Sequence, residues 1–165
     1  MQVRAQQYLI RTYTVGDGLV MNRVRGFFQS QDGFMWMYTW DGLSRYEGYR
    51  FRNYIAGRDL QHSFINDILE MPDGTMYLPL NDGSMAVMHN QEVDSVHLNP
   101  GAVINIFCKV DDKVYVGMDE MGIGLFNNGE LINAKFDPRI NSVLQLIYHQ
   151  DHFFFIGPSQ GHSGV

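Results

Sequence analysis

An aromatic ring, a carboxylate and a guanidinium lie close together in the sequence at Trp40, Asp41 and Arg45. An aromatic ring can stack on a sugar, and a guanidinium can form two parallel hydrogen bonds to a carboxylate. These residues therefore predict a binding site for a sugar or a uronic acid. The alternative is that Trp40 packs against a neighbouring structural unit and Asp41 only shapes a turn.

Motifs for catalysis are missing from the sequence. There is no Gly-Lys-Ser/Thr phosphate loop and no Gly-x-Ser-x-Gly nucleophile elbow, and Gly122-Ile123-Gly124 is only half of a dinucleotide-binding fingerprint. The paired acids Asp111-Asp112 and Asp119-Glu120 fall where solvated turns are expected. We expect no catalytic residue, no cofactor and no enzymatic activity in this chain.

Two further groups of residues could bind a metal or react. His149 and His152 flank one expected turn, but strand geometry should point the two rings apart, so we predict no metal site. Cys108 is the only cysteine and lies within an apolar run, which predicts a small buried side chain rather than a nucleophile.

Four aspartates mark a repeat that would position all these residues. Asp32, Asp73, Asp111 and Asp151 follow one another at intervals of 41, 38 and 40 residues. Apolar residues recur at fixed distances from each aspartate. The columns are Val24, Ile65, Val103 and Val143; Phe27, Ile68, Ile106 and Leu146; Phe28, Leu69, Phe107 and Ile147; and Trp36, Tyr77, Tyr115 and Phe155. Each unit predicts a strand, a tight turn and a second strand bearing an aromatic residue.

Turn residues divide each unit into short strands. Asp32-Gly33 and Asp73-Gly74 predict hairpins, whereas the later units lack this glycine, so their turns should differ in type or be longer. Second turns at Asp41-Gly42 and Asp82-Gly83 leave no room for a helix of ordinary length. In the first unit, two further strands are expected at 43–46 and 50–54. Four short antiparallel strands in about 40 residues predict an all-β fold of β-propeller blades.

Alternation along the second strand predicts how the blades pack. Phe34, Trp36 and Tyr38 should face one side, while Met35, Met37 and Thr39 should face the other. Nearly all of these residues are apolar. The strand should therefore be covered on both sides by its neighbours.

The repeat predicts about three and a half blades, forming an open arc or part of a larger seven-bladed propeller. We expect blades at roughly 9–54, 55–98, 99–138 and 139–157, followed by a tail or truncation point at 158–165. The segment 1–8 should be a stub. Its small residues Val3 and Ala5 fit the positions read by a signal peptidase, although an ordinary disordered start explains them equally well.

Charge and hydropathy exclude some partners. The formal net charge is −6, and the sequence contains no run of Lys or Arg, so we expect no nucleic-acid partner. No apolar stretch approaches the roughly 20 residues needed for a membrane span, so membrane attachment would come only through a parent protein.

The stretch from Tyr13 to Tyr54 resembles the two-component regulator propeller repeat. That pattern combines a leading Asp-Gly-Leu, Asn-x-Val, Asp-x-x-Gly-x-x-Trp, Thr, a second Asp-Gly-Leu, Arg-Tyr and a closing Phe-x-x-Tyr. The matching elements are Asp17-Gly18-Leu19, Asn22-x-Val24, Asp32-Gly33 with Trp36, Thr39, Asp41-Gly42-Leu43, Arg45-Tyr46 and Phe51-x-x-Tyr54. Tyr38 and Pro79 replace the usual glycine of the second strand, and Pro79 should make the second blade irregular, with a bulge or an unpaired carbonyl.

This resemblance implies an extracytoplasmic, periplasmic sensor of a hybrid two-component system. The chain would then be an N-terminal part of a ligand-sensing propeller, responding to a glycan-derived ligand such as an oligosaccharide and signalling to a kinase elsewhere in the parent protein. Its partners would include the remaining blades of that receptor and a second copy in a homodimer. Two alternatives are a protein-interaction or dimerisation scaffold without a small-molecule site and, less favoured, a carbohydrate-active propeller enzyme.

Overall fold

The computed structural model describes residues 10–97, 102–132 and 140–158, which form an all-β fold with one short 3-10 helix, η1 (Val15–Asp17). The expected stub at 1–8 and the tail beyond Pro158 lie outside the described residues. Within these described segments, no helix has the length and apolar character needed to cross a membrane.

The strands form three four-stranded antiparallel sheets and one two-stranded sheet. The first contains β1 (Val24–Gln29), β2 (Met35–Thr39), β3 (Leu43–Tyr46) and β4 (Phe51–Tyr54), and the second contains β5 (Leu69–Glu70), β6 (Met76–Pro79), β7 (Ser84–His89) and β8 (Glu92–His97). The third contains β9 (Val103–Val110), β10 (Lys113–Asp119), β11 (Gly122–Asn127) and β12 (Glu130–Ile132), and the fourth contains β13 (Gln145–His149) and β14 (His152–Ile156). Neighbours in each sheet follow chain order, which confirms the predicted propeller-type fold.

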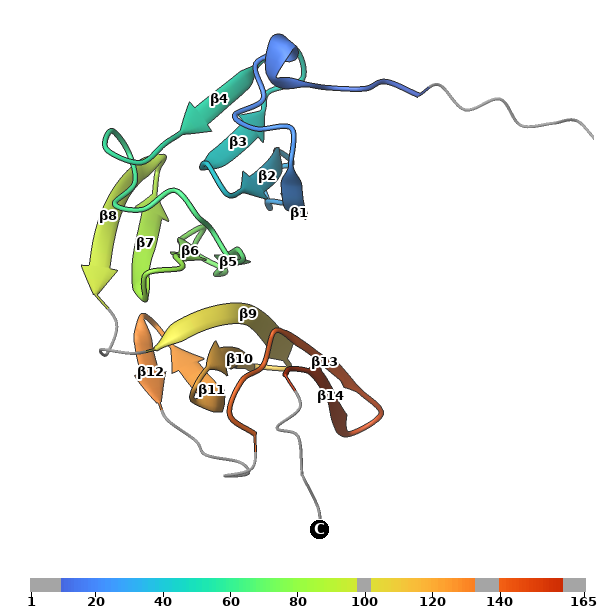
Figure 1. The fold of residues 1–165 in the computed structure, drawn as a ribbon, viewed down its shortest axis with the longest axis vertical. Helices are drawn as coiled ribbons and strands as arrows, with labels where there is room; N and C mark the ends of the chain where they lie inside the picture. Colours follow the sequence, from blue (N-terminus) through green and yellow to red (C-terminus); the bar gives the residue numbers. More distant parts are fainter. Residues whose placement is uncertain (1–9, 98–101, 133–139, 159–165) are drawn as a thin grey trace, which may run out of the picture.

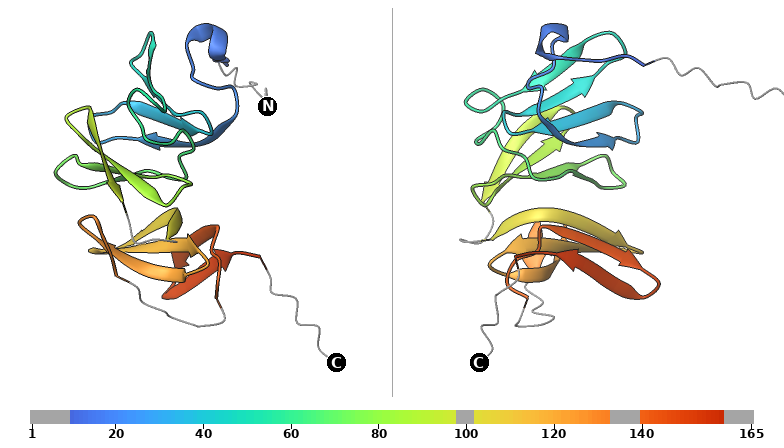
Figure 2. Two further views of the ribbon diagram at one scale, coloured as in Figure 1. Left: turned by 60° about the vertical axis from the view of Figure 1, so that its left-hand side comes forward. Right: turned by 45° about the vertical axis from the view of Figure 1, so that its right-hand side comes forward.

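The sheets follow one another along an open arc (Figures 1 and 2). Strands β1, β5, β9 and β13 lie on its concave side, whereas β4, β8 and β12 lie on its convex side (Figure 1). Each sheet can therefore bury its faces only against the sheets before and after it.

Apolar clusters fill the three junctions between sheets. Trp36, Leu43, Ile65, Leu78 and Met88 belong to the first, while the second contains Tyr77, Met85, Ile104, Val116 and Phe126, and the third contains Cys108, Ile123, Val143 and Leu146. Neighbouring residues of β6 enter different clusters, so the predicted cover on both sides is confirmed there. It is wrong for Met35 of β2, which is 37% exposed on the outer face of the first sheet.

Turn type follows the glycine pattern. Gly33 and Gly74 adopt φ of 89° and 84°, and their N–H groups donate to the carbonyls of Ser30 and Met71 at 2.8 and 2.9 Å. The later units instead use two-residue turns, at 111–112 and 150–151. The expected difference in type is confirmed, and these turns are shorter rather than longer.

The shorter turns shift the repeat by one residue. Phe28 pairs with Trp36 and Leu69 with Tyr77, eight residues apart, whereas Cys108 pairs with Tyr115 and Ile147 with Phe154, seven apart. The sequence columns that grouped Phe107 with Phe28 and Phe155 with Trp36 are therefore wrong by one residue. Cys108 occupies the position of Phe28 and is buried, as predicted.

The bulge or unpaired carbonyl predicted at Pro79 is absent from β6, and the irregularity of this sheet lies in the neighbouring strand. Strand β5 has only two residues, and its pairing with β6 resumes at an isolated bridge between Ile65 and Leu80. The Pro79 carbonyl is not orphaned, because it accepts the Asn66 N–H at 2.9 Å. The pairing of β6 with β7 runs without a bulge.

Candidate functional site

Trp40 and Asp41 lie together in the turn between β2 and β3. Trp40 is 39% exposed, and its ring stacks on Phe64 of the second unit, with 5.5 Å between ring centroids and 16° between planes. The guanidinium of Arg23 lies over the same ring at 4.8 Å. The Asp41 N–H donates to the Thr39 hydroxyl at 3.0 Å, so this residue also helps to shape the turn.

A second arginine extends this cluster. The Arg25 guanidinium lies 4.6 Å over the Phe64 ring and donates to the Asn66 side-chain oxygen at 3.1 Å. Burial lowers its pKa. Two cations therefore flank a pair of aromatic rings, an arrangement suited to an acidic or π-rich ligand. Sequence reasoning missed Arg23 and Phe64 because both precede strands, where no pattern marks them.

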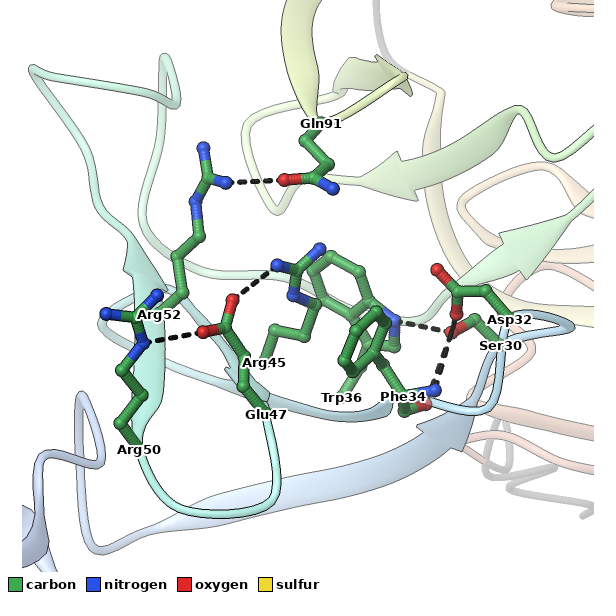
Figure 3. A network of polar contacts seen from close by, with 9 residues as sticks. All are labelled: Ser30, Asp32, Phe34, Trp36, Arg45, Glu47, Arg50, Arg52 and Gln91. Carbon is green, nitrogen blue, oxygen red and sulfur yellow. Dashed lines mark hydrogen bonds and ion pairs between the residues drawn. The ribbon is translucent and has the colours of Figure 1, made fainter.

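Arg45 lies elsewhere. Its guanidinium is 4.4 Å over the Phe34 ring and 5.5 Å over the Trp36 ring, and the residue is only 4% exposed. It forms an ion pair with Glu47, which also accepts a hydrogen bond from Arg50 at 2.7 Å (Figure 3). The hydrogen bonds from Arg45 and then from Arg50 lower the pKa of Glu47 to about 2. The structure thus provides a guanidinium beside Trp40, but it belongs to Arg23.

Arg45 lines a cavity of about 390 Å³ between the first two sheets. The first sheet contributes Ser30, Gln31, Asp32, Trp36 and Arg45, and the second unit contributes Glu70, Pro72, Asp73, Gly74, Met76, Met88, Asn90 and Gln91. No sequence signal marked the contribution of the second unit, because acids and amides at turns are ordinarily solvated.

Hydrogen bonds fix the walls of this cavity. The Trp36 indole N–H donates to the Ser30 hydroxyl at 2.9 Å, and that hydroxyl bonds the Asp32 carboxylate (Figure 3). Across the junction, the Gln31 N–H donates to Glu70 at 2.8 Å, and Arg52 donates to the side-chain oxygen of Gln91. The two sheets are therefore tied together at the rim.

The Arg45 guanidinium is not fully satisfied. Its Nε and Nη1 atoms are buried and have no hydrogen-bond partner among the described residues. An unpaired buried donor costs about 1–3 kcal/mol. The cavity and the polar residues that line it make the junction a candidate site, although the two unpaired Arg45 atoms have almost no accessible surface.

The predicted histidine pair lies at the turn between β13 and β14. His149 pairs with His152 across the strands, and the His152 Nδ1 atom lies 2.6 Å from the Gln150 carbonyl oxygen. In the part of the chain that the structure describes, no three His, Cys, Asp or Glu residues are grouped so as to hold a metal ion.

Several solved structures are similar to this chain in fold. The chain superimposes on the extracellular domain assigned to the hybrid two component system BT3049 of B. thetaiotaomicron with a TM-score of 0.67, at 16% identity over 83% of this chain. The extracellular domain assigned to the one component system BT4673 of the same organism gives 0.65, at 17% identity over 80% of this chain. A structure of YCF48 bound to D1 peptide gives 0.57 at 11% identity, over 80% of this chain and 47% of that one.

The chain spans 19% of the length of each of the two B. thetaiotaomicron domains. No family model matches the sequence, and no curated protein matches it either. At these identities the structural matches show a shared propeller-type fold, and the resemblance to the propeller repeat rests on the sequence motifs.

Proposed function

We propose that this chain is part of the extracytoplasmic, periplasmic sensor propeller of a hybrid two-component regulator and binds a glycan-derived ligand without transforming it. The observation that carries the proposal is the match of 83% of the chain to an extracellular domain of a hybrid two component system, with a TM-score of 0.67. The repeat motifs between Tyr13 and Tyr54 support the same assignment independently of the coordinates.

The Trp40 turn is the place at which we propose that an acidic sugar binds. Trp40 retains exposed ring surface, Asp41 is exposed beside it, and Arg23 brings a guanidinium to the same ring. A uronic acid could lie against the exposed part of the indole and place its carboxylate near this cation. Signalling would follow from a shift in the arrangement of the parent receptor on binding.

Calorimetric titration of the chain with oligosaccharides containing uronic acids tests this function. We expect Trp40→Ala and Arg23→Gln each to weaken binding at least about tenfold, or about 1.4 kcal/mol. Arg11→Gln removes a different cation, which lies over Tyr13, and serves as the matched control. If no saccharide binds, the ligand class is wrong, and release of shortened products would reveal an enzyme instead.

A second function, a dimerisation or protein-interaction scaffold, is favoured by exposed apolar surface at both ends of the arc. In the fourth sheet, Ile147, Phe154 and Ile156 are 62%, 59% and 66% exposed, and in the first sheet Phe27 is 68% exposed. Soluble monomers seldom expose large contiguous apolar patches. Sedimentation equilibrium of the chain and of Phe154→Ser tests this reading: a dimer that the substitution dissociates would favour the scaffold, whereas two monomeric proteins would contradict it.

A further inference from the structure

We propose that two copies of this chain bind head to tail, with the outer face of the first sheet of each copy covered by the outer face of the fourth sheet of the other. The first of these surfaces, which exposes Phe27 and Met35, is called the head face. The second, which exposes Ile147, Phe154 and Ile156, is called the tail face. The proposal rests on the scaffold function given above, for which it names the partner and the two surfaces, and it is independent of saccharide binding.

The head face has the side chains of a surface that is covered elsewhere in the chain. By strand pairing, Phe27 and Met35 hold the places that Ile68 and Met76 hold in the second sheet. Ile68 and Met76 are buried in the first apolar cluster, because the first sheet packs over them. Phe27 and Met35 are exposed at the equivalent positions. The head face is therefore equivalent to the second-sheet half of the first junction.

The tail face is equivalent to the opposite half of a junction. Ile147 pairs with Phe154 as Leu69 pairs with Tyr77 in the second sheet. Leu69 and Tyr77 are buried in the second apolar cluster, because the third sheet packs over them. Ile147 and Phe154 are exposed at the equivalent positions. A sheet that packs over them would need a surface of the head type.

The three junctions within the chain all join these two types of surface. Residues of the tail type are named first and those of the head type second: Trp36 with Ile68 and Met76 in the first cluster, Tyr77 with Val114 in the second, and Tyr115 with Leu146 and Phe153 in the third. The same combination of surfaces thus recurs three times in one chain. A second copy carries the surface that would complete each exposed face.

The head face also contains a groove that can receive a large side chain. Its volume is about 340 Å³, and Phe27, Met35, Phe51 and Tyr13 are among the residues that line it. Phe154 of the second copy occupies the position of Trp36 and Tyr77, the aromatic residues that fill the first two junctions. We expect the Phe154 ring to enter this groove, because burial of an aromatic side chain contributes strongly to an interface.

Charge favours head-to-tail binding over the two symmetric alternatives. Residues 10–54 contain six arginines and four acidic residues, which gives a net charge of +2. Residues 102–158 contain four basic and seven acidic residues, which gives a net charge of −3. Contact between two head faces or two tail faces would bring like charges together, whereas head-to-tail contact brings opposite charges together.

The curvature of the arc predicts that two copies form a closed ring. The sheets follow one another around one concave side (Figure 1), so a further junction of the same kind would continue the curve. The four described sheets of each copy would give eight in the pair. That number lies within the four to eight blades that are typical of propellers. A head-to-tail contact that closes in this way gives a dimer, and one that does not close gives a growing polymer.

Sedimentation equilibrium of the full chain tests the proposal with substitutions on each face. Phe27→Ser and Met35→Ser alter the head face, and Ile147→Ser and Phe154→Ser alter the tail face. All four residues are exposed, so the substitutions should leave the melting temperature of the monomer unchanged. Tyr49→Ser is the matched control, because Tyr49 is also an exposed aromatic residue of the first unit but does not line the groove.

We expect the wild type to form a dimer, each head or tail substitution to raise its dissociation constant at least about tenfold, and Tyr49→Ser to leave it unchanged. A monomeric wild type would overturn both this pairing and the scaffold function. A dimer weakened by substitutions on only one of the two faces would overturn head-to-tail binding and leave the scaffold function standing. A mass that grows beyond two copies with concentration would overturn the closed ring. If Met35→Ser lowers the melting temperature, Phe27→Ser decides for the head face.

Discussion

The junction between the first two sheets and the junction between the third and fourth have the same strand arrangement but bury different side chains. The first buries polar groups, including Asn66, Ser30 and Arg45, and encloses a cavity. The third is built around Cys108, Ile123, Val143 and Leu146, all apolar. The apolar junction forms from the same kind of strand pairing, so a buried polar cluster is not needed to join two sheets, although Arg45 belongs to the Arg-Tyr element of the repeat pattern in the first unit.

The structural feature that the two junctions share is a bulge that links neighbouring sheets. The pairing shifts between Val24 and Gly26 in β1, and between Ile104 and Ile106 in β9. The bulged residue then reaches the next sheet: Arg25 donates to the Asn66 side chain at 3.1 Å, and Asn105 donates to the Val143 carbonyl at 3.1 Å. This link belongs to the fold, so the residues that differ around it are the places to look for function.

The largest effect on stability that we predict comes from giving the first sheet a residue found at the equivalent position of the third. Tyr38 pairs with Gly26, whereas in the third sheet Gly117 pairs with Ile106, so the small and large residues have exchanged strands. A Cβ on Gly26 would lie 2.1 Å from the Tyr38 hydroxyl oxygen. Gly26→Ile should therefore reduce the free energy of unfolding by about 3 kcal/mol, measured by urea denaturation.

Gly26→Ile combined with Tyr38→Gly copies the third sheet and serves as the control. A double-mutant cycle should give a favourable coupling of about 2 kcal/mol. A coupling energy near zero would show that the Ile106–Gly117 pair of the third sheet cannot replace the Gly26–Tyr38 pair of the first.

A smaller effect should come from Asp67, the counterpart of Gly26 in the second sheet. Its carboxylate accepts the Phe107 N–H at 2.7 Å and lies 3.4 Å from the Tyr38 hydroxyl, and burial raises its pKa to about 6. The native state thus binds this proton more tightly than the unfolded state does. The free energy of unfolding should fall as pH rises from about 4 to about 6. Above pH 6 it should be lower by the full amount of about 2–3 kcal/mol.

Asp67→Asn keeps an acceptor for Phe107 and removes the charge. Its advantage over the wild type should grow by about 2–3 kcal/mol between pH 4 and pH 7 in denaturant titrations. Asp73→Asn provides the opposite case, because backbone and side-chain hydrogen bonds from Thr75 lower the pKa of Asp73. A pH-independent difference for Asp67→Asn would mean that this carboxyl does not titrate abnormally in the folded protein.

The two asparagines that link sheets should contribute different amounts to the free energy of unfolding. Asn66 is buried, accepts from Arg25 and donates to the Ile104 carbonyl at 2.9 Å, whereas Asn105 makes its link to Val143 from a partly buried position. We expect Asn66→Ala to cost about 2 kcal/mol and Asn105→Ala about 1 kcal/mol in free energy of unfolding. Equal costs would show that Arg25 adds nothing to the first junction.

Strand number, strand order and the two-sided packing of the second blade follow from sequence because turn glycines and apolar alternation are local signals. The one-residue shift in the later units does not, because Asp111 and Asp151 mark turns whose length depends on backbone conformation. Gln150 and Asp151 both adopt positive φ, at 48° and 62°, which allows a two-residue turn without glycine.

The candidate sites were only partly predictable for a related reason. Trp40 and Asp41 are neighbours in one turn, so sequence proximity placed them together correctly. Arg45 is close to Trp40 in sequence, but it lies on β3 opposite Trp36, and its guanidinium lies over Phe34 and Trp36. The cavity depends on Glu70 and Gln91, which reach the first sheet only through the packing of the second. Contacts between sheets cannot be predicted from the spacing of residues within a single repeat.

The smallest effect on stability should come from Arg45→Met, although this residue is the most buried cation of the first junction. Val87 and Leu125 show that an apolar side chain fits the equivalent position, and Glu47 would keep its bond to Arg50. Replacing a buried charge by an apolar residue of similar size is often neutral, so the free energy of unfolding should change by less than about 1 kcal/mol. Urea denaturation of Arg45→Met and Arg50→Met side by side measures this difference. A loss of about 3 kcal/mol confined to Arg45→Met would show that the guanidinium stabilises the blade, whereas a neutral result would show that an apolar side chain serves the same position equally well.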